Sequence, residues 1–253
     1  MRQEQRALLL TPLERARATA FPAGEYVGQE SFMRAGEVRR LAHLAGVNPG
    51  ASVLDLCCGE AGPGRTIAAE SGCHYLGIDH SASALATARE LAWNLPCRFE
   101  QAHLPPLPEG HYEVVLLLET MLAFPAKDAL VAEVARVLKP GGRFAFTVEE
   151  GKPLSQQERV RMPGADSVWL IELAELTGVL REAGLTVIWQ LECSSSHQAM
   201  AAALGRCYRA DSRQIADQIG TRATAELITA HGLWSAWLGS GRVRKFAMVA
   251  EKL

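Results

Sequence analysis

The residues with the clearest chemical pattern lie in VLDLCCGEAGPGR, residues 53–65. An apolar run containing the acid Asp55 leads into a loop with glycines at 59, 62 and 64. Glycines let a backbone adopt positive φ and approach a ligand closely, and the helix N-terminus expected after the loop favours polar or anionic groups. Asp79 follows 24 residues after Asp55, where a carboxylate can accept both hydroxyls of a ribose. The pattern indicates a nucleoside site, although any tight strand-to-helix turn also uses glycine.

The spacing of these glycines excludes two common nucleotide motifs. The order Gly59-Glu60-Ala61-Gly62-Pro63-Gly64 does not fit the G-x-G-x-x-G fingerprint of dinucleotide-binding folds. No G-x-x-x-x-G-K-[ST] motif occurs in the chain, so a P-loop is also excluded. The expected nucleoside site therefore belongs to neither the dinucleotide-binding folds nor the P-loop proteins.

Four blocks, in the correct order, resemble the class I S-adenosylmethionine-dependent methyltransferases, in particular the small-molecule, type 11 and sterol-methyltransferase-like members. VLDLCCGEAG (53–62) resembles the first motif, and GIDHSASALATAR (77–89) resembles the acid of the second strand with its following helix. PLPEGHYEVVLLLE (106–119) resembles the stretch into the fourth strand, and LVAEVARVLKPGGRFAFT (130–147) the helix-KPGG-strand block. The resemblance covers about residues 50–150 and implies S-adenosyl-L-methionine as cofactor.

The sequence departs from the family pattern at three positions. Cys57 and Ala61 stand where glycine is usual, but both are small, so we expect the turn to survive and favour a packing role for the Cys57 side chain. His103 stands where an acid normally binds the adenine amino group. An imidazole can stack on adenine or hydrogen-bond to it instead.

Carried over residue by residue, the resemblance implies a set of cofactor contacts. The backbone around Cys57, Gly59 and Ala61 would lie against the methionine part, and Asp79 would hold the ribose hydroxyls. Leu117 or Leu118 would present a carbonyl to the cofactor amine. In similar enzymes the segment before the core folds over the cofactor, and here it supplies Tyr26, Gln29 and Ser31. The implied cofactor residues are Tyr26, Gln29, Ser31, Asp55, Cys57, Gly59, Ala61, Asp79, His80, His103, Leu104, Leu117 and Leu118.

Three side chains are candidates for catalysis. Glu119 ends the fourth expected strand, and sterol-type carbon methyltransferases carry an acid near this place to steady a developing cation or take a proton. His197 and His231 are candidate bases or acceptor contacts. The alternatives are that Glu119 caps a helix or binds the cofactor amine through water, and that the histidines are structural. Trp234 and Trp237 line an apolar pocket or belong to the core.

The elements that must position these residues alternate between β-rich and helical patterns. Strands are expected at 51–57, 73–79, 97–102, 112–119, 143–149, 185–193 and 242–251, and helices at 65–71, 81–95, 127–138, 168–183, 197–219 and 223–238. Alternation of this kind predicts an α/β fold. With the resemblance, we expect a Rossmann-like seven-stranded sheet, mostly parallel with an antiparallel last strand, helices on both faces and a helical cap.

The expected domain organisation has one cofactor-binding domain with additions. Residues 35–193 and 242–253 form the S-adenosylmethionine-binding domain, and residues 1–34 form an N-terminal cap segment. Residues 194–241 interrupt what is a tight hairpin in the minimal family fold, and long structured insertions often form lids. We therefore expect a helical cap over the acceptor site, built from 1–34, 151–168 and 194–241.

Composition limits the partners and the compartment. The 253 residues carry 26 basic and 28 acidic side chains, so no global basic field attracts nucleic acid or an anionic membrane. The motif [NDS]-P-P-[YFW] of nucleic acid and protein N-methylating enzymes is absent. The basic cluster of Arg242, Arg244 and Lys245 is interpreted as a solvated face on an edge strand. The six cysteines form no CxxC pair, which predicts no metal site and a reduced, cytoplasmic protein.

The predicted function is methyl transfer to a small organic acceptor, for example a natural-product or specialised-metabolism intermediate, by a chain that could be a homodimer. One alternative is a cyclase or decarboxylase that keeps the cofactor as a structural element. A non-catalytic cofactor-binding protein is a second alternative, and a NAD-dependent oxidoreductase is a third.

Overall fold

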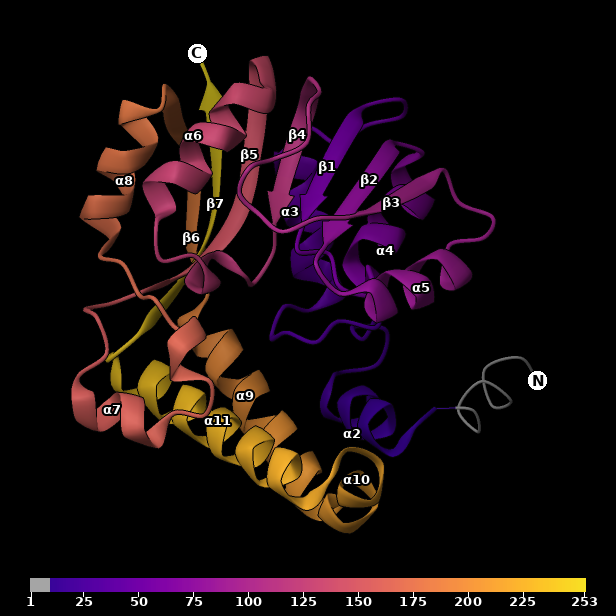
Figure 1. Cartoon of the computed structure of the whole chain (residues 1–253), viewed down its shortest axis with the longest axis vertical. Helices are drawn as coiled ribbons and strands as arrows, with labels where there is room; N and C mark the ends of the chain where they lie inside the picture. Colours follow the sequence, from indigo (N-terminus) through magenta and orange to yellow (C-terminus); the bar gives the residue numbers. More distant parts are fainter. Residues whose placement is uncertain (1–9) are drawn as a thin grey trace.

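The computed structural model of the chain describes residues 10–253, so the first nine residues of the expected N-terminal cap segment lie outside the described part. Its strands are β1 (Ser52–Leu56), β2 (His74–Asp79), β3 (Cys97–Gln101), β4 (Tyr112–Leu117), β5 (Leu138–Glu150), β6 (Leu185–Glu192) and β7 (Arg244–Lys252). They form one sheet in the order β3-β2-β1-β4-β5-β7-β6 (Figure 1). The first five strands pair in parallel, and β7 runs antiparallel to β5 and to β6. The predicted Rossmann-like fold class is confirmed.

Helices cover both faces of the sheet. One face is covered by α3 (Ala35–Leu44), α4 (Gly62–Ser71) and α5 (Ala82–Leu91), and the other by α6 (Lys127–Val137) and α8 (Leu173–Glu182). Ser81 caps α5, because its hydroxyl accepts the Ala84 N–H at 3.2 Å. None of the helices within residues 10–253 is long and apolar enough to cross a membrane.

The expected helix at 168–183 begins five residues later than predicted. The segment before it does not continue the helix because Ile171 forms a β-bridge with Glu150 at the end of β5. The chain then becomes helical only at Leu173, after Glu172. Apolar spacing alone does not reveal this tertiary contact.

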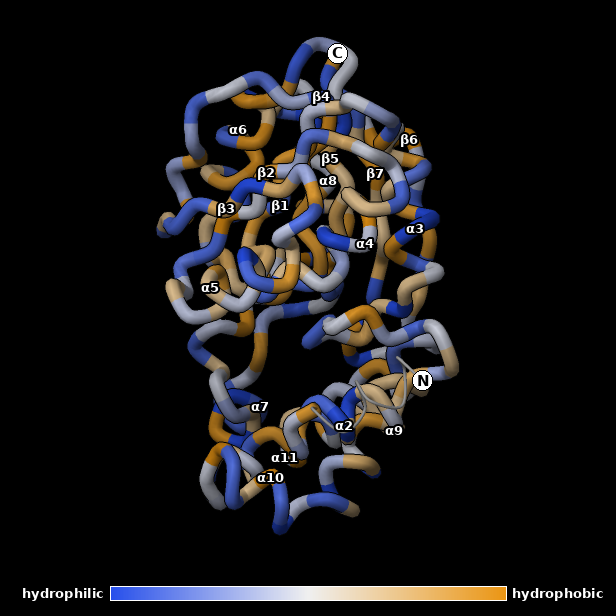
Figure 2. Tube along the Cα trace, turned by 90° about the vertical axis from the view of Figure 1, so that its right-hand side faces the viewer, coloured by the Kyte–Doolittle hydropathy of each residue, from blue (hydrophilic) through white to orange (hydrophobic). Residues whose placement is uncertain are grey.

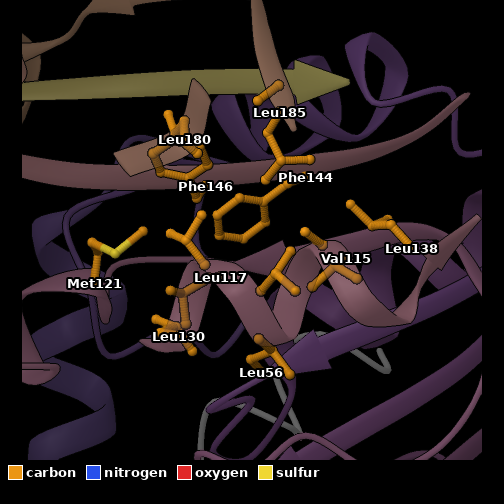
Figure 3. Close-up of a cluster of buried hydrophobic side chains, with 14 of the residues drawn as sticks. Leu56, Val115, Leu117, Met121, Leu130, Leu138, Phe144, Phe146, Leu180 and Leu185 are labelled. Atoms are coloured by element: carbon orange, nitrogen blue, oxygen red, sulfur yellow. The ribbon is translucent and has the colours of Figure 1, made fainter. Parts of the chain in front are cut away.

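Buried apolar side chains of β4 and β5 pack together on one face of the sheet, near the ends of the two strands. Leu117 of β4 pairs with Phe146 of β5, and the rings of Phe144 and Phe146 stack with centroids 4.4 Å apart (Figure 3). Burying one such side chain contributes about 1.5–3 kcal/mol. Because the register is set by this core, residues 118–120 and 147–150 emerge at the same edge of the sheet.

A further helical layer lies beyond the carboxyl ends of the parallel strands (Figures 1 and 2). It contains α2 (Pro12–Ala20), α7 (Gln156–Arg161), the short α10 (Ser212–Ile219), and the two long helices α9 (Ser194–Ala210) and α11 (Thr221–Ser240). One apolar cluster joins α2 to α9 and α10 through Met200, Leu204 and Tyr208. A second cluster contains Trp237, whose ring meets Trp234 edge-on at 5.5 Å. The tryptophans therefore contribute to the packing of this layer.

The interpretation of the basic cluster as a solvated edge is wrong. β7 lies between β5 and β6, so it is an interior strand. The Lys245 side chain is only 1% exposed and is paired with Glu149 on β5. Arg242 and Arg244 form ion pairs with Glu158 and Glu150. The sheet order decides this, because the last strand of the chain inserts next to the fifth.

Candidate active site

The loop between β1 and α4 is built on left-handed backbone at three alternating residues. Cys57, Gly59 and Ala61 have φ values of 57°, 55° and 54°. Two of them carry a Cβ, which costs roughly 1–2 kcal/mol each in this region. The turn nevertheless survives, held by hydrogen bonds from the Cys58 N–H to the Ile78 carbonyl at 3.0 Å and from the Ala61 N–H to the Cys58 carbonyl at 2.8 Å. The loop therefore keeps the backbone conformation typical of glycine at positions 57 and 61, although Cys57 and Ala61 stand there.

Asp79, at the end of β2, organises the loops around it. One carboxylate oxygen accepts the Gly59 N–H at 2.8 Å, and the other accepts the Ser81 N–H at the same distance. Hydrogen bonds to an ionised group contribute about 1.5–3 kcal/mol each. The same side chain thus holds both the glycine loop and the N-terminus of α5.

Asp55 is buried beneath the loop. Its carboxyl accepts the Tyr75 hydroxyl at 2.6 Å. Burial raises the pKa of Asp55 from 3.8 to about 7, while the Tyr75 hydrogen bond opposes the rise and the Asp79 carboxylate adds to it. Asp55 therefore holds its proton under mildly acidic conditions.

We expect this proton to give a measurable pH dependence of stability. Because the pKa is higher in the folded state, the stabilisation is complete below about pH 4 and is lost as the pH rises through about 7. Relative to Asp55→Asn, the free energy of unfolding of the wild type should fall with rising pH, by up to about 1.4 kcal/mol per unit. Denaturant unfolding of both proteins across this range measures the difference, and a pH-independent difference would contradict the assignment.

A cavity of about 820 Å³ lies over the loop, at the carboxyl ends of β1, β2 and β4. The structure brings most of the predicted site residues to its walls: Gln29, Ser31, Asp55, Cys57, Gly59, Ala61, Asp79, His80, His103, Leu104, Leu118 and Glu119. Tyr26, Leu117, His197 and His231 do not line it. The cavity is large enough for a nucleoside-sized ligand.

Two imidazoles stand together in the cavity wall. The rings of His80 and His103 are 5.9 Å apart and tilted by 35°. The Gln101 side-chain amide, at the end of β3, donates to the His80 carbonyl at 2.9 Å. This bond links the segments that carry the two histidines. The pair presents aromatic faces and ring nitrogens where the family usually presents an acid.

A strap, residues 25–33, lies across the start of α4. A Cβ on Gly62 would be 2.4 Å from the Val27 carbonyl oxygen, so the strap rests directly on this glycine. The Gln29 amide accepts the Val27 N–H at 2.6 Å and donates to the carbonyls of Glu25 and Met33. Gln29 therefore lines the cavity, but the hydrogen bonds of its side-chain amide stabilise the fold of the strap.

Tyr26 of the strap faces the helical layer. Its ring centroid lies 5.5 Å from that of Phe21, and burial raises its pKa to about 12. The phenol therefore stays neutral and packs with α2 and its neighbours.

Glu119, two residues beyond β4, joins the sheet to the strap. Its backbone has a φ of 65°, and its N–H donates to the Thr147 hydroxyl at 2.7 Å. Its carboxylate accepts the Phe32 N–H at 3.3 Å and forms an ion pair with Lys245 at 2.9 Å. The group is therefore engaged on both sides and is not a free base.

The two candidate histidines both pack edge-on against Phe32, outside the cavity. His197 is 1% exposed, and its Nδ1 is 3.9 Å from the Glu119 carboxylate. Burial would lower its pKa, but Glu119 and Glu37 outweigh burial and raise it to about 10.

The Nδ1 of His231 lies 2.8 Å from the Leu227 carbonyl, and burial lowers the pKa of His231. Its ring also packs edge-on against Phe32 and Tyr208. His231 is a neutral packing residue in this arrangement.

Sequence reasoning missed the partners of Glu119. Lys245, Glu149 and Glu37 were not candidates, and neither was Thr147. In the sequence, the only sign that Lys245 is buried is its position directly before the apolar run Phe246–Ala250. In the structure, Lys245 on β7 is paired with Glu149 on β5. Only the sheet order makes that charge interior.

The sheet order, the glycine loop after the first strand and the acid at the end of the second define the S-adenosylmethionine-dependent methyltransferase fold of class I. Residues 53–142 match the family model described as a methyltransferase domain. This segment of the chain is therefore similar to methyltransferase domains, and the whole chain has their Rossmann-like fold.

Two curated relatives resemble part of the chain, and a solved structure shares its fold. The sterol 24-C-methyltransferase ERG6B of Gibberella zeae is 34% identical over 125 residues, covering 46% of this chain and 32% of the relative. The 27-O-demethylrifamycin SV methyltransferase of Amycolatopsis mediterranei is 31% identical over 157 residues, covering 58% of each. The crystal structure of the [4+2]-cyclase SpnF superposes with a TM-score of 0.75 at 21% identity, covering 98% of this chain and 94% of that one. The chain thus spans about a third to three-fifths of the curated relatives it matches.

Proposed function

We propose that the chain is a methyltransferase of the EC 2.1.1 class that transfers a methyl group from S-adenosyl-L-methionine to a small organic acceptor. The observation that carries the proposal is the cavity in which the glycine loop, Asp79 and the two imidazoles meet. The family match and the relatives' names support the same reaction.

The cavity residues fit the cofactor. The positive-φ backbone at Cys57, Gly59 and Ala61 forms a tight turn whose side chains are small or absent, which suits the methionine part. Asp79 would hold the ribose hydroxyls, since each carboxylate oxygen accepts one N–H and retains a second lone pair. His80 and His103 would flank the adenine.

The remaining contacts come from the strap and the end of β4. Ser31 would bind the cofactor carboxylate, and Gln29 would act by shaping the strap. The Leu118 carbonyl, which already accepts the Thr120 hydroxyl at 3.1 Å, would also accept the cofactor ammonium.

When bound, the cofactor supplies an electrophilic methyl group on a sulfonium. The chain's own task is to align the acceptor with that methyl and to exclude water, and such positioning supplies much of the acceleration. A base is needed only where the acceptor must lose a proton. Of the three candidate catalytic residues only Glu119 lines the cavity, and its carboxylate, held by Phe32 and Lys245, would act there as a fixed charge.

We infer that the acceptor binds between the sheet and the helical layer. In this proposal residues 35–193 and 242–253 form the cofactor domain, and the described residues 10–34 together with 194–241 form the cap. The apolar clusters around Tyr208 and Trp237 hold the cap together. A capped, near-neutral protein suits a small acceptor better than a nucleic acid, and the sterol and rifamycin relatives favour a natural-product intermediate.

Titration calorimetry of the full chain with S-adenosylmethionine tests the first half of the proposal, and we expect one saturable site. Incubation with methyl-labelled cofactor and a panel of small hydrophobic acceptors tests the second, with S-adenosylhomocysteine release as the readout. Cofactor binding with turnover but no S-adenosylhomocysteine would indicate a cyclase or decarboxylase. Binding of NAD in place of S-adenosylmethionine would overturn the proposal.

A further inference from the structure

Five ionisable side chains meet at the edge of the cavity. We call these five residues the Glu119 network. They come from five different elements: Glu119 after β4, Glu149 on β5, Lys245 on β7, His197 on α9 and Glu37 on α3. Glu119 lines the cofactor cavity, while the other four do not. A carboxylate is therefore the first charge of the network that a ligand in the cavity meets.

Lys245 sits between two carboxylates. Its Nζ is 2.9 Å from Glu119 and makes a shorter contact with Glu149, with which it is in register across the sheet. The side chains of Lys245 and Glu149 are 1% and 8% exposed. Burial of so many charges is costly unless they are paired, and the cost indicates a function beyond packing.

The two carboxylates do not share the charge equally. Burial raises the pKa of Glu149, and although burial would also raise that of Glu119, Lys245 and His197 lower it. Of the two carboxylates, Glu149 therefore takes up a proton more readily and Glu119 is the more readily ionised. The opposite face of His197 is occupied by Glu37, with Nε2 3.5 Å from its carboxylate.

The position of the Glu119 carboxylate is over-determined. The backbone has a φ of 65° and its N–H donates to Thr147. The carboxylate accepts the Phe32 N–H and pairs with Lys245, while His197 Nδ1 adds a charge 3.9 Å away. A left-handed conformation at a bulky residue is strained and persists where the surroundings impose it. Glu119 Oε1, Glu149 Oε2 and His197 Nδ1 are buried with no hydrogen-bond partner among the described residues. Native cores rarely leave such atoms unmatched, so the network is not arranged for stability alone.

We propose that Lys245 is a positioning residue that holds Glu119 as a carboxylate in the cavity wall, so that the site favours the sulfonium cofactor over its product with a neutral sulfur. The inference rests on the proposed function. Methyl transfer removes one positive charge from the sulfur, and a fixed carboxylate in a partly desolvated cavity stabilises only the charged form. Lys245 and His197 lie behind the carboxylate and set its charge without facing the ligand.

The test compares the affinities of the wild type and Lys245→Met for S-adenosylmethionine and S-adenosylhomocysteine by calorimetry. Without Lys245, Glu119 loses the cation that most lowers its pKa, so its carboxylate takes up a proton more readily. We expect the affinity ratio of S-adenosylmethionine to S-adenosylhomocysteine to fall about tenfold, the usual scale for losing one nearby charge. A structural role alone would lower both affinities together and leave the ratio unchanged, which would overturn the proposal.

Two further variants keep the test decisive. Glu119→Gln preserves shape and should lower the ratio as Lys245→Met does, even where the latter folds poorly. Arg244→Met is the matched control, because Arg244 is the neighbouring cation on β7 and pairs with Glu150 at the surface. It should leave the ratio unchanged. Failure of the wild type to bind either compound would overturn the proposed function, whereas binding with an unaltered ratio in Glu119→Gln would overturn only the role of Lys245.

Discussion

The Asp79→Ala variant should bind S-adenosylmethionine at least about tenfold more weakly than the wild type, because each lost hydrogen bond to the carboxylate is worth about 1.5–3 kcal/mol. The substitution removes the group proposed to hold the ribose hydroxyls. It also frees the Gly59 and Ser81 N–H groups, so the glycine loop and the start of α5 lose their common anchor. Calorimetry with S-adenosylmethionine measures the affinity, and denaturant unfolding separates the loss of stability from the loss of contact.

Glu100→Ala is the matched control for Asp79. Glu100 is an exposed acid on β3 and pairs with Ile78, one position before the Asp79–Gln101 pair. Its removal changes the net charge equally but touches neither loop, so the affinity should stay within about twofold of wild type. Equal affinity of Asp79→Ala and wild type would remove Asp79 from the site.

The Gly62→Ala variant should displace the strap. The new Cβ would lie 2.4 Å from the Val27 carbonyl oxygen and 2.7 Å from backbone atoms of Gly28, and backbone cannot rotate away as a side chain can. Overpacking of this kind costs about 1–3 kcal/mol. Because Gln29, Ser31 and Met33 of the strap line the cavity, we also expect weaker S-adenosylmethionine binding, by about tenfold if roughly 1.4 kcal/mol of contact is lost. Hydrogen exchange of residues 25–33 should rise.

Gly178→Ala controls for the loss of a glycine. Gly178 lies within α8, where an added Cβ meets nothing within 4 Å. Alanine should therefore stabilise the helix by about 0.5–1 kcal/mol and leave cofactor affinity unchanged. If Gly62→Ala behaved like Gly178→Ala, the strap would not be seated on α4.

Local sequence determined much of the cofactor-binding core. The strands and helices between residues 52 and 150 follow from short-range apolar periodicity and glycine placement. Their alternation predicted an α/β fold, and the family resemblance implied the seven-stranded sheet. The loop residues and Asp79 could be located because a strand end, a turn and a helix start are adjacent in the chain. Their approach to one another is then dictated by parallel pairing, which brings the carboxyl ends of β1, β2 and β4 together.

Tertiary structure decided what local patterns do not encode. Glu119 looked like a free acid at the rim, yet its charge and direction depend on Lys245, 126 residues away in the chain, and on His197 from an inserted helix. Tyr26 looked like a cofactor contact but packs with Phe21, and the cluster containing Lys245 looked solvated because its strand was assigned to an edge. The physical reason is that burial and long-range pairing set the charge and orientation of these groups. Both depend on how distant strands and the helical layer come together, which local sequence does not specify.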